Sequence, residues 1–117
     1  LPGKTEMDCS YGAITTLTPA GAGTANIDLN VTNRYHITMP AGNISITVSN
    51  ATAGQVFLIR ILQDSGGSRT ITSWFTTIRW AGGSAPTLTL TGSKADTVIF
   101  YATGTTTFDG FLVGQNI

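Results

Sequence analysis

The stretch Val56-Phe57-Leu58-Ile59-Arg60-Ile61-Leu62 decides the fold, because six of its seven residues are apolar. A run this short that contains several β-branched residues is typical of a β-strand buried on both faces. A second run, Val98-Ile99-Phe100-Tyr101, has the same character. We expect both runs to be central strands, covered on their two faces by a second sheet or by a neighbouring subunit.

The segments around these runs alternate apolar and polar residues, which is the period of a strand with one buried face. The apolar positions of the alternating segments are Ile27, Leu29 and Val31, then Ile44, Ile46 and Val48, then Leu88 and Leu90. Turn-forming Gly, Asn, Asp and Ser cluster between the runs, at 40–43, 50–54, 64–68, 82–84 and 103–105. The pattern predicts an all-β fold of about eight to ten short antiparallel strands, arranged as a β-sandwich of the jelly-roll kind.

The domain organisation follows from length and pattern together. A chain of 117 residues has the size of one domain. Alternation begins near residue 13, so residues 13–117 are predicted to form a single β-sandwich domain. Residues 1–12 show no alternation and are predicted to be an amino-terminal arm or connector.

Charge is scarce and balanced, which excludes several kinds of partner. Charged residues make up 10% of the chain, against about 25% in an average soluble domain. Six basic residues balance six acidic ones, so no basic footprint for nucleic acid is expected. No apolar run reaches the roughly 18 residues of a membrane span, so no membrane insertion is expected. So few charges predict either a surface made of Thr, Ser, Asn and Gly, or a surface that another chain partly covers.

The second half of the chain carries a series of short motifs in a fixed order. It contains Gln63-Asp64-Ser65-Gly66-Gly67-Ser68-Arg69-Thr70-Ile71-Thr72, then Ile78-Arg79-Trp80-Ala81-Gly82-Gly83-Ser84-Ala85-Pro86-Thr87-Leu88, then Asp96 to Phe100, and ends near Gly104 and Gly110. From about Ile14 onward this order resembles a domain common in virion proteins of tailed bacteriophages, usually tail-fibre or other particle-surface proteins. Each motif alone is weak evidence for the family, and the resemblance rests on the order and spacing of all of them. The family often has Trp-Pro where this chain has Trp74-Phe75.

The resemblance implies a β-sandwich that associates with copies of itself, often as a trimer, at the surface of the phage particle. The prediction is a non-enzymatic virion structural protein, such as a capsid decoration, head-fibre or tail-fibre module, that forms a homotrimer. Its expected partners are its own copies, other virion proteins and a bacterial surface glycan, with a contribution to host attachment. The alternative is a carbohydrate-binding module that uses loop aromatics.

The sequence contains few residues that could form a catalytic site. Cys9 is the single cysteine, which excludes an internal disulfide framework and a multi-cysteine zinc site. His36 is the single histidine, and a hydrolytic triad would need it beside a nucleophilic serine and an aspartate such as Asp28. No nucleophile motif accompanies it, so we interpret His36 as a strand histidine on the surface or at a subunit contact. No enzyme activity, cofactor or metal is predicted.

Two pairs of residues are the candidates for contacts with partners. Trp74 and Phe75 lie where the chain departs from the family pattern, so they are candidates to contact a glycan or a partner protein. The alternative for both is packing in the core or at a subunit contact. Arg60 lies inside an apolar strand, where an unpaired charge would cost several kcal/mol. We therefore predict that Arg60 has a carboxylate partner, Asp96 being the first choice, and that the pair lies at a subunit interface.

Overall fold

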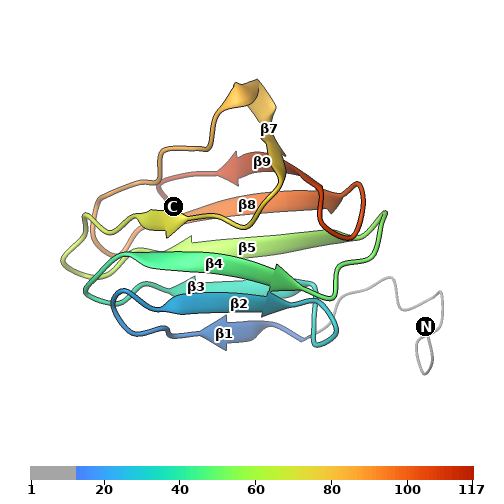
Figure 1. Ribbon diagram of the computed structural model, residues 1–117. Helices are drawn as coiled ribbons and strands as arrows, with labels where there is room; N and C mark the ends of the chain where they lie inside the picture. Colours follow the sequence, from blue (N-terminus) through green and yellow to red (C-terminus); the bar gives the residue numbers. More distant parts are fainter. Residues whose placement is uncertain (1–12) are drawn as a thin grey trace.

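Nine strands and one short 3-10 turn make up residues 13–117, the part of the chain that the computed structural model describes (Figure 1). The strands are β1 (Thr15–Leu17), β2 (Thr24–Asp28), β3 (Arg34–Thr38), β4 (Ile44–Ser49), β5 (Val56–Leu62), β6 (Ile71–Ser73), β7 (Ile78–Trp80), β8 (Ala95–Ala102) and β9 (Phe108–Gly114), and the turn η1 (Ala81–Gly83) follows β7. The prediction of a predominantly β chain is confirmed. The predicted arm at residues 1–12 lies outside the described residues.

The strands form two sheets, whose pairing differs from the prediction. The larger sheet has the order β1-β3-β5-β8-β9-β7, and the smaller has the order β2-β4-β6. Within the described residues, five of the seven strand pairings are parallel, and only β5–β8 and β8–β9 are antiparallel. The predicted antiparallel arrangement is therefore wrong for most pairs, and the sheets are mixed.

The parallel pairing arises because the chain passes from one sheet to the other at each step. From β1 to β7 successive strands alternate between the large and the small sheet. Parallel neighbours need a crossover connection. For the four parallel pairs among β1 to β6 the crossover is a strand of the opposite sheet, whereas β7 and β9 are joined through β8 of their own sheet. In Figure 1, β2 and β4 lie in front of the lower strands of the large sheet, while β8 and β9 form its upper part.

The central position of the two apolar runs is confirmed. β5 lies between β3 and β8, and β8 lies between β5 and β9. Alternate residues of these strands, among them Phe57, Ile59, Val98 and Phe100, are at most 1% exposed and face the small sheet. Only this inner face is covered by described residues of the same chain, which leaves the other face open.

Aromatic rings fill the part of the core beneath β8 and β9. Phe100 stacks on Phe57 with ring centroids 5.2 Å apart and meets Phe75 edge-on at 4.9 Å. Phe75 in turn lies edge-on to Phe108 at 5.0 Å. The Trp80 ring also packs edge-on against Phe100, at 5.6 Å. Edge-to-face contacts of this kind add to the stabilisation from burial alone.

Two of the alternating segments do not extend as predicted. β2 ends at Asp28, whose carboxylate accepts the N–H of Asn30 at 2.9 Å and so turns the chain away. Val31 consequently lies in a turn and is 62% exposed. The segment containing Leu88 and Leu90 forms no strand, because the N–H of Thr89 donates to the Asp96 carboxylate instead of to a strand neighbour.

Gln63 is a buried amide that joins two loops. Its Nε2 donates to the carbonyl oxygens of Arg69 and Thr89, and its Oε1 accepts the N–H groups of Asp64 and Arg69. The side chain is only 5% exposed, and all four of these bonds are 2.9–3.2 Å long. The two loops lie so close together that a Cβ at Gly67 would meet the carbonyl oxygen of Leu90. A glycine is therefore required at this position.

Candidate interaction surface

The open face of the large sheet carries a continuous apolar patch, which we define as Val56, Leu58, Ile99, Tyr101 and Phe111. Side chains on one face of a sheet alternate along each strand and align across strands. The register places Leu58 opposite Ile99, Ile99 opposite Phe111, and Val56 opposite Tyr101. These side chains therefore lie side by side on the face opposite Phe57 and Phe100.

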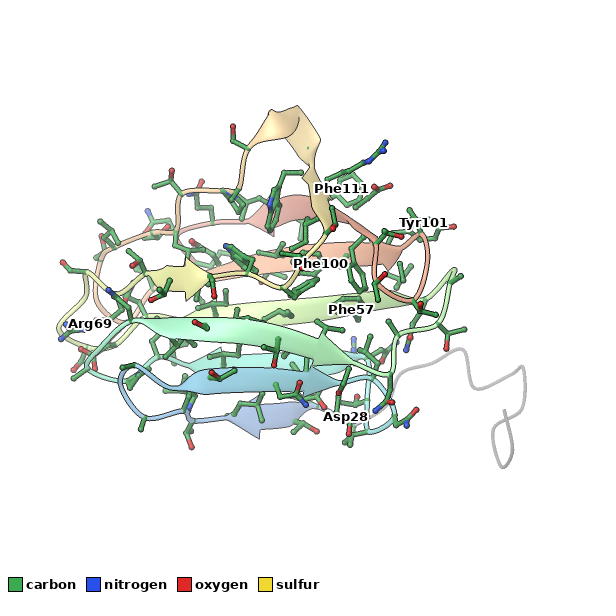
Figure 2. The ribbon with its side chains drawn as sticks, in the orientation of Figure 1. Asp28, Phe57, Arg69, Phe100, Tyr101 and Phe111 are labelled. Atoms are coloured by element: carbon green, nitrogen blue, oxygen red, sulfur yellow. The ribbon has the colours of Figure 1, made fainter. Side chains whose placement is uncertain are left out.

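The patch is accessible to a partner. Val56 is 50% exposed, Tyr101 43% and Phe111 41%, while Leu58 and Ile99 are half-buried between their neighbours. In Figure 2, Phe57 and Phe100 lie within the core, whereas Tyr101 projects at the end of β8. Large apolar residues grouped on one face of a small protein are typical of a contact surface.

A row of two arginines and a histidine, made of Arg34, His36 and Arg60, borders the patch on the side of β3. His36 lies directly opposite Arg60 in the parallel pairing of β3 with β5. Removal from water lowers the pKa of His36 below 6.5, and the positive charges of Arg60 and then Arg34 lower it further. The neutral imidazole is therefore favoured in the folded protein.

This depressed pKa predicts that folding stability falls as the pH drops from about 7 to about 5. The unfolded chain, with a histidine pKa near 6.5, binds a proton first and so becomes favoured as the pH falls. His36→Gln removes the titrating group and is expected to flatten this part of the profile. The measurement is the thermal midpoint of both proteins across this range, and equal slopes would contradict the assignment.

The outer face of the small sheet has the opposite character. Its side chains bond to one another: Asn26 donates to Ser49 at 3.2 Å and accepts from Thr47 at 2.9 Å. Asn50 donates to the Asp28 carboxylate at 2.8 Å, and this bond, followed by the Asn30 N–H, lowers the pKa of Asp28. One outer face is thus a polar network, and the other is mainly apolar.

The predicted pairing of Arg60 with Asp96 is wrong. The register of β5 and β8 places Arg60 opposite Thr97 and Asp96 opposite Ile61. A difference of one residue moves a side chain to the other face of a sheet, so Arg60 lies on the open face and Asp96 faces inward. Among the described residues no carboxylate forms an ion pair with Arg60.

Asp96 instead binds the backbone of two other segments of the chain. It is 3% exposed, and its two oxygens accept the N–H groups of Thr89 at 2.6 Å and Asn116 at 2.9 Å. Both oxygens are thus paired with backbone donors, and a side chain buried in this position is not accessible to another subunit. Sequence reasoning recognised Arg60 as unusual, but it could not assign the face.

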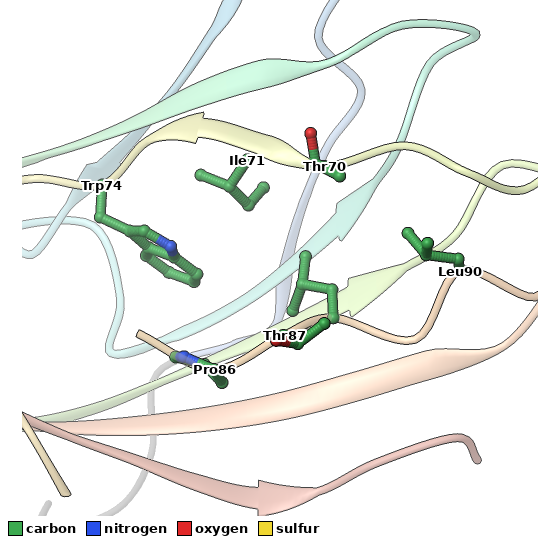
Figure 3. Close-up of a pocket in the computed structure, with 7 residues that line it drawn as sticks. Thr70, Ile71, Trp74, Pro86, Thr87 and Leu90 are labelled. Carbon is green, nitrogen blue, oxygen red and sulfur yellow. The ribbon is translucent and has the colours of Figure 1, made fainter. Parts of the chain in front are cut away.

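Trp74 and Phe75 have different environments. Phe75 is 8% exposed and belongs to the aromatic core, so the prediction that it contacts a glycan or partner is wrong. Trp74 is half-buried and packs edge-on against Trp80 at 5.1 Å. It borders a pocket of about 160 Å³ (Figure 3), which is lined by Thr70, Ile71, Trp74, Pro86, Thr87, Leu88 and Leu90.

The remaining sequence predictions concern Cys9, a metal site and a membrane span. Cys9 lies outside the described residues. Within residues 13–117, no three His, Cys, Asp or Glu side chains come together as a metal site. The described residues also include no helix with the length and apolar character of a membrane span.

β5 and β8 were predicted to be covered on both faces, by a second sheet or by a neighbouring subunit. The described residues cover one face only, and the apolar patch is the face left open. The sequence already carries this second apolar face, because Leu58, Ile99 and Tyr101 are apolar at the positions that alternate with the core residues. Comparison with protein-family models, with curated proteins and with solved structures finds no match to this chain.

Proposed function

We propose that this chain is a non-enzymatic structural module of a bacteriophage particle that forms a homotrimer through the open face of its large sheet. The observation that carries the self-association is the apolar patch. Burying its five side chains against another copy would remove them from water, which is the main source of stabilisation in association. The scarcity of charge in the whole chain also favours an assembly in which much of the surface is covered.

The position in a phage particle rests on the resemblance of the ordered motifs between Gln63 and Gly110. In that setting the polar outer face of the small sheet faces solvent, and other virion proteins or a bacterial surface glycan are the further partners. A trimer presents three copies of any weak binding site, so host attachment gains from avidity. The module acts by geometry, without a catalytic step.

The test of self-association is absolute mass in solution, measured by light scattering behind a sizing column. The parent chain is expected at three times 12.2 kDa. Tyr101→Lys places a charge in the patch, beside Val56, and is expected to raise the dissociation constant at least about tenfold, which corresponds to about 1.4 kcal/mol. Val31→Lys, at a 62% exposed turn position, is the control and should keep the parent mass.

The outcomes separate the proposal from its alternative. A parent chain that stays monomeric at all concentrations would contradict self-association. It would favour the carbohydrate-binding module, whose remaining candidate is Trp74 beside its apolar pocket. A Tyr101→Lys variant with the parent's dissociation constant would show that copies associate through another surface.

A further inference from the structure

The outer edge of β9 is only partly occupied. β7 pairs with β9 at Phe108, Asp109 and Gly110 and then leaves the sheet. The following residues, Phe111–Gly114, have no strand neighbour on that side among the described residues. Phe111, Leu112 and Val113 are 41%, 37% and 56% exposed. This uncovered segment, 111–114, we call the β9 edge.

The backbone of the β9 edge has hydrogen-bonding groups directed outward. The N–H of Phe108 donates to the carbonyl oxygen of Thr77, on the β7 side, at 2.9 Å. The N–H of Ala102, which lies opposite Phe108, donates away from β9 to Gln55 at 2.8 Å. Since this direction alternates along a strand, Leu112 directs its N–H and C=O away from β8. These groups are available to pair with a strand added from outside.

The large sheet has a second uncovered edge at its opposite side. β1 is the terminal strand and pairs only with β3. Its neighbourhood, Ile14 to Thr18, carries no charge, and Ile14 is 52% exposed. The described residues place no strand on the far side of β1. The β9 edge is also uncharged, whereas natural proteins commonly protect exposed edges with lysine or proline.

Strand direction makes the two edges compatible. β1, β3 and β5 are parallel, and two antiparallel steps from β5 through β8 give β9 the same direction as β1. Copies related by rotation about an axis along the strands keep this direction. The β9 edge of one copy would therefore meet β1 of the next copy in parallel, with four residues available to the three of β1.

We propose that the β9 edge of one copy binds β1 of a second copy by strand addition, head to tail, so that three copies close a ring. The inference rests on the proposed self-association and specifies which residues join the copies. Pairing of two β9 edges would instead form a two-fold dimer and leave β1 uncovered. The head-to-tail arrangement covers both edges, and it allows the apolar patches of three sheets to face the common axis.

The test uses three lysine variants of the full chain. Leu112→Lys blocks the β9 edge, and Leu112 lies opposite Val98, on the inner side of the sheet, so the apolar patch is unchanged. Thr16→Lys blocks β1 at an exposed position, and Val31→Lys is the control. Circular dichroism spectra equal to that of the parent establish that each variant is folded.

Native mass spectrometry then reports the copy number. Each edge variant alone is expected to lose the three-copy species and to appear as a single copy, while the control keeps three. An equimolar mixture of the two edge variants retains one intact β9 edge and one intact β1. It is expected to give a two-copy complex with one chain of each mass, and no closed ring.

Two results would overturn the head-to-tail pairing while leaving the proposed self-association in place. The first is that the parent associates and both edge variants keep the parent's copy number. The other is a mixture without the mixed two-copy complex, when the parent itself forms three copies. A parent that is monomeric at every concentration would overturn both proposals.

Discussion

Phe100→Ala is expected to lower the free energy of unfolding by about 3–5 kcal/mol, the usual loss for an aromatic residue removed from a core. Phe100 is fully buried, and its ring lies within 6 Å of the rings of Phe57, Phe75, Trp74 and Trp80. Alanine would leave a cavity that these rings cannot close without losing their edge-on contacts. Urea unfolding followed by tryptophan fluorescence measures the change.

Phe111→Ala is the matched control, because it removes the same ring from a position that is 41% exposed. At a protein concentration low enough to keep copies apart, its loss should stay below about 1 kcal/mol. Equal losses for Phe100→Ala and Phe111→Ala would show that the aromatic cluster is not the centre of the core.

Gln63→Glu is expected to destabilise the fold by about 3 kcal/mol, although it changes the volume of the side chain very little. The Nε2 of Gln63 donates to the carbonyl oxygens of Arg69 and Thr89 in a buried site. A carboxylate would place an acceptor against two acceptors, and hydrogen bonds of a buried group that remain unmade cost about 1–3 kcal/mol each. Thermal unfolding of the variant and the parent at the same pH measures the difference.

Gln55→Glu is the control for this charge change. The Oε1 of Gln55 accepts the N–H of Thr52 at 3.1 Å, and a carboxylate can accept that bond equally well. Its effect should stay within about 0.5 kcal/mol. The deficit of Gln63→Glu should narrow on acidification, since a protonated carboxyl regains one donor. A deficit independent of pH would contradict the explanation.

The two apolar runs were sufficient to locate the centre of the large sheet. A strand surrounded by other strands has few positions that tolerate polar side chains, so 56–62 and 98–101 stand out in the sequence. The weaker alternation near Leu88 misled the prediction, because Leu88 is a buried residue of a loop that Asp96 holds in place. A buried apolar residue in a loop and one in a strand differ in their backbone hydrogen bonds, which the sequence does not show.

The sites were harder to predict than the strands. Arg60 was recognised as out of place in its strand, yet its expected partner lies on the other face of the sheet. Phe75, expected in a loop contact, packs against Phe100 and Phe108. In both cases the residue type showed that the side chain needs a particular environment. Only the positions of residues distant in the sequence determined which environment it has.

The sequence by itself determined that this chain is predominantly β, which runs are central, and which residues of each run share a face. These properties depend on a local period of two and on burial, and both are encoded in neighbouring residues. The tertiary structure decided the direction of the strands, the division into two sheets, and the open face and edges. Parallel and antiparallel neighbours bury the same alternating side chains, so direction depends on the path of the connections between sheets.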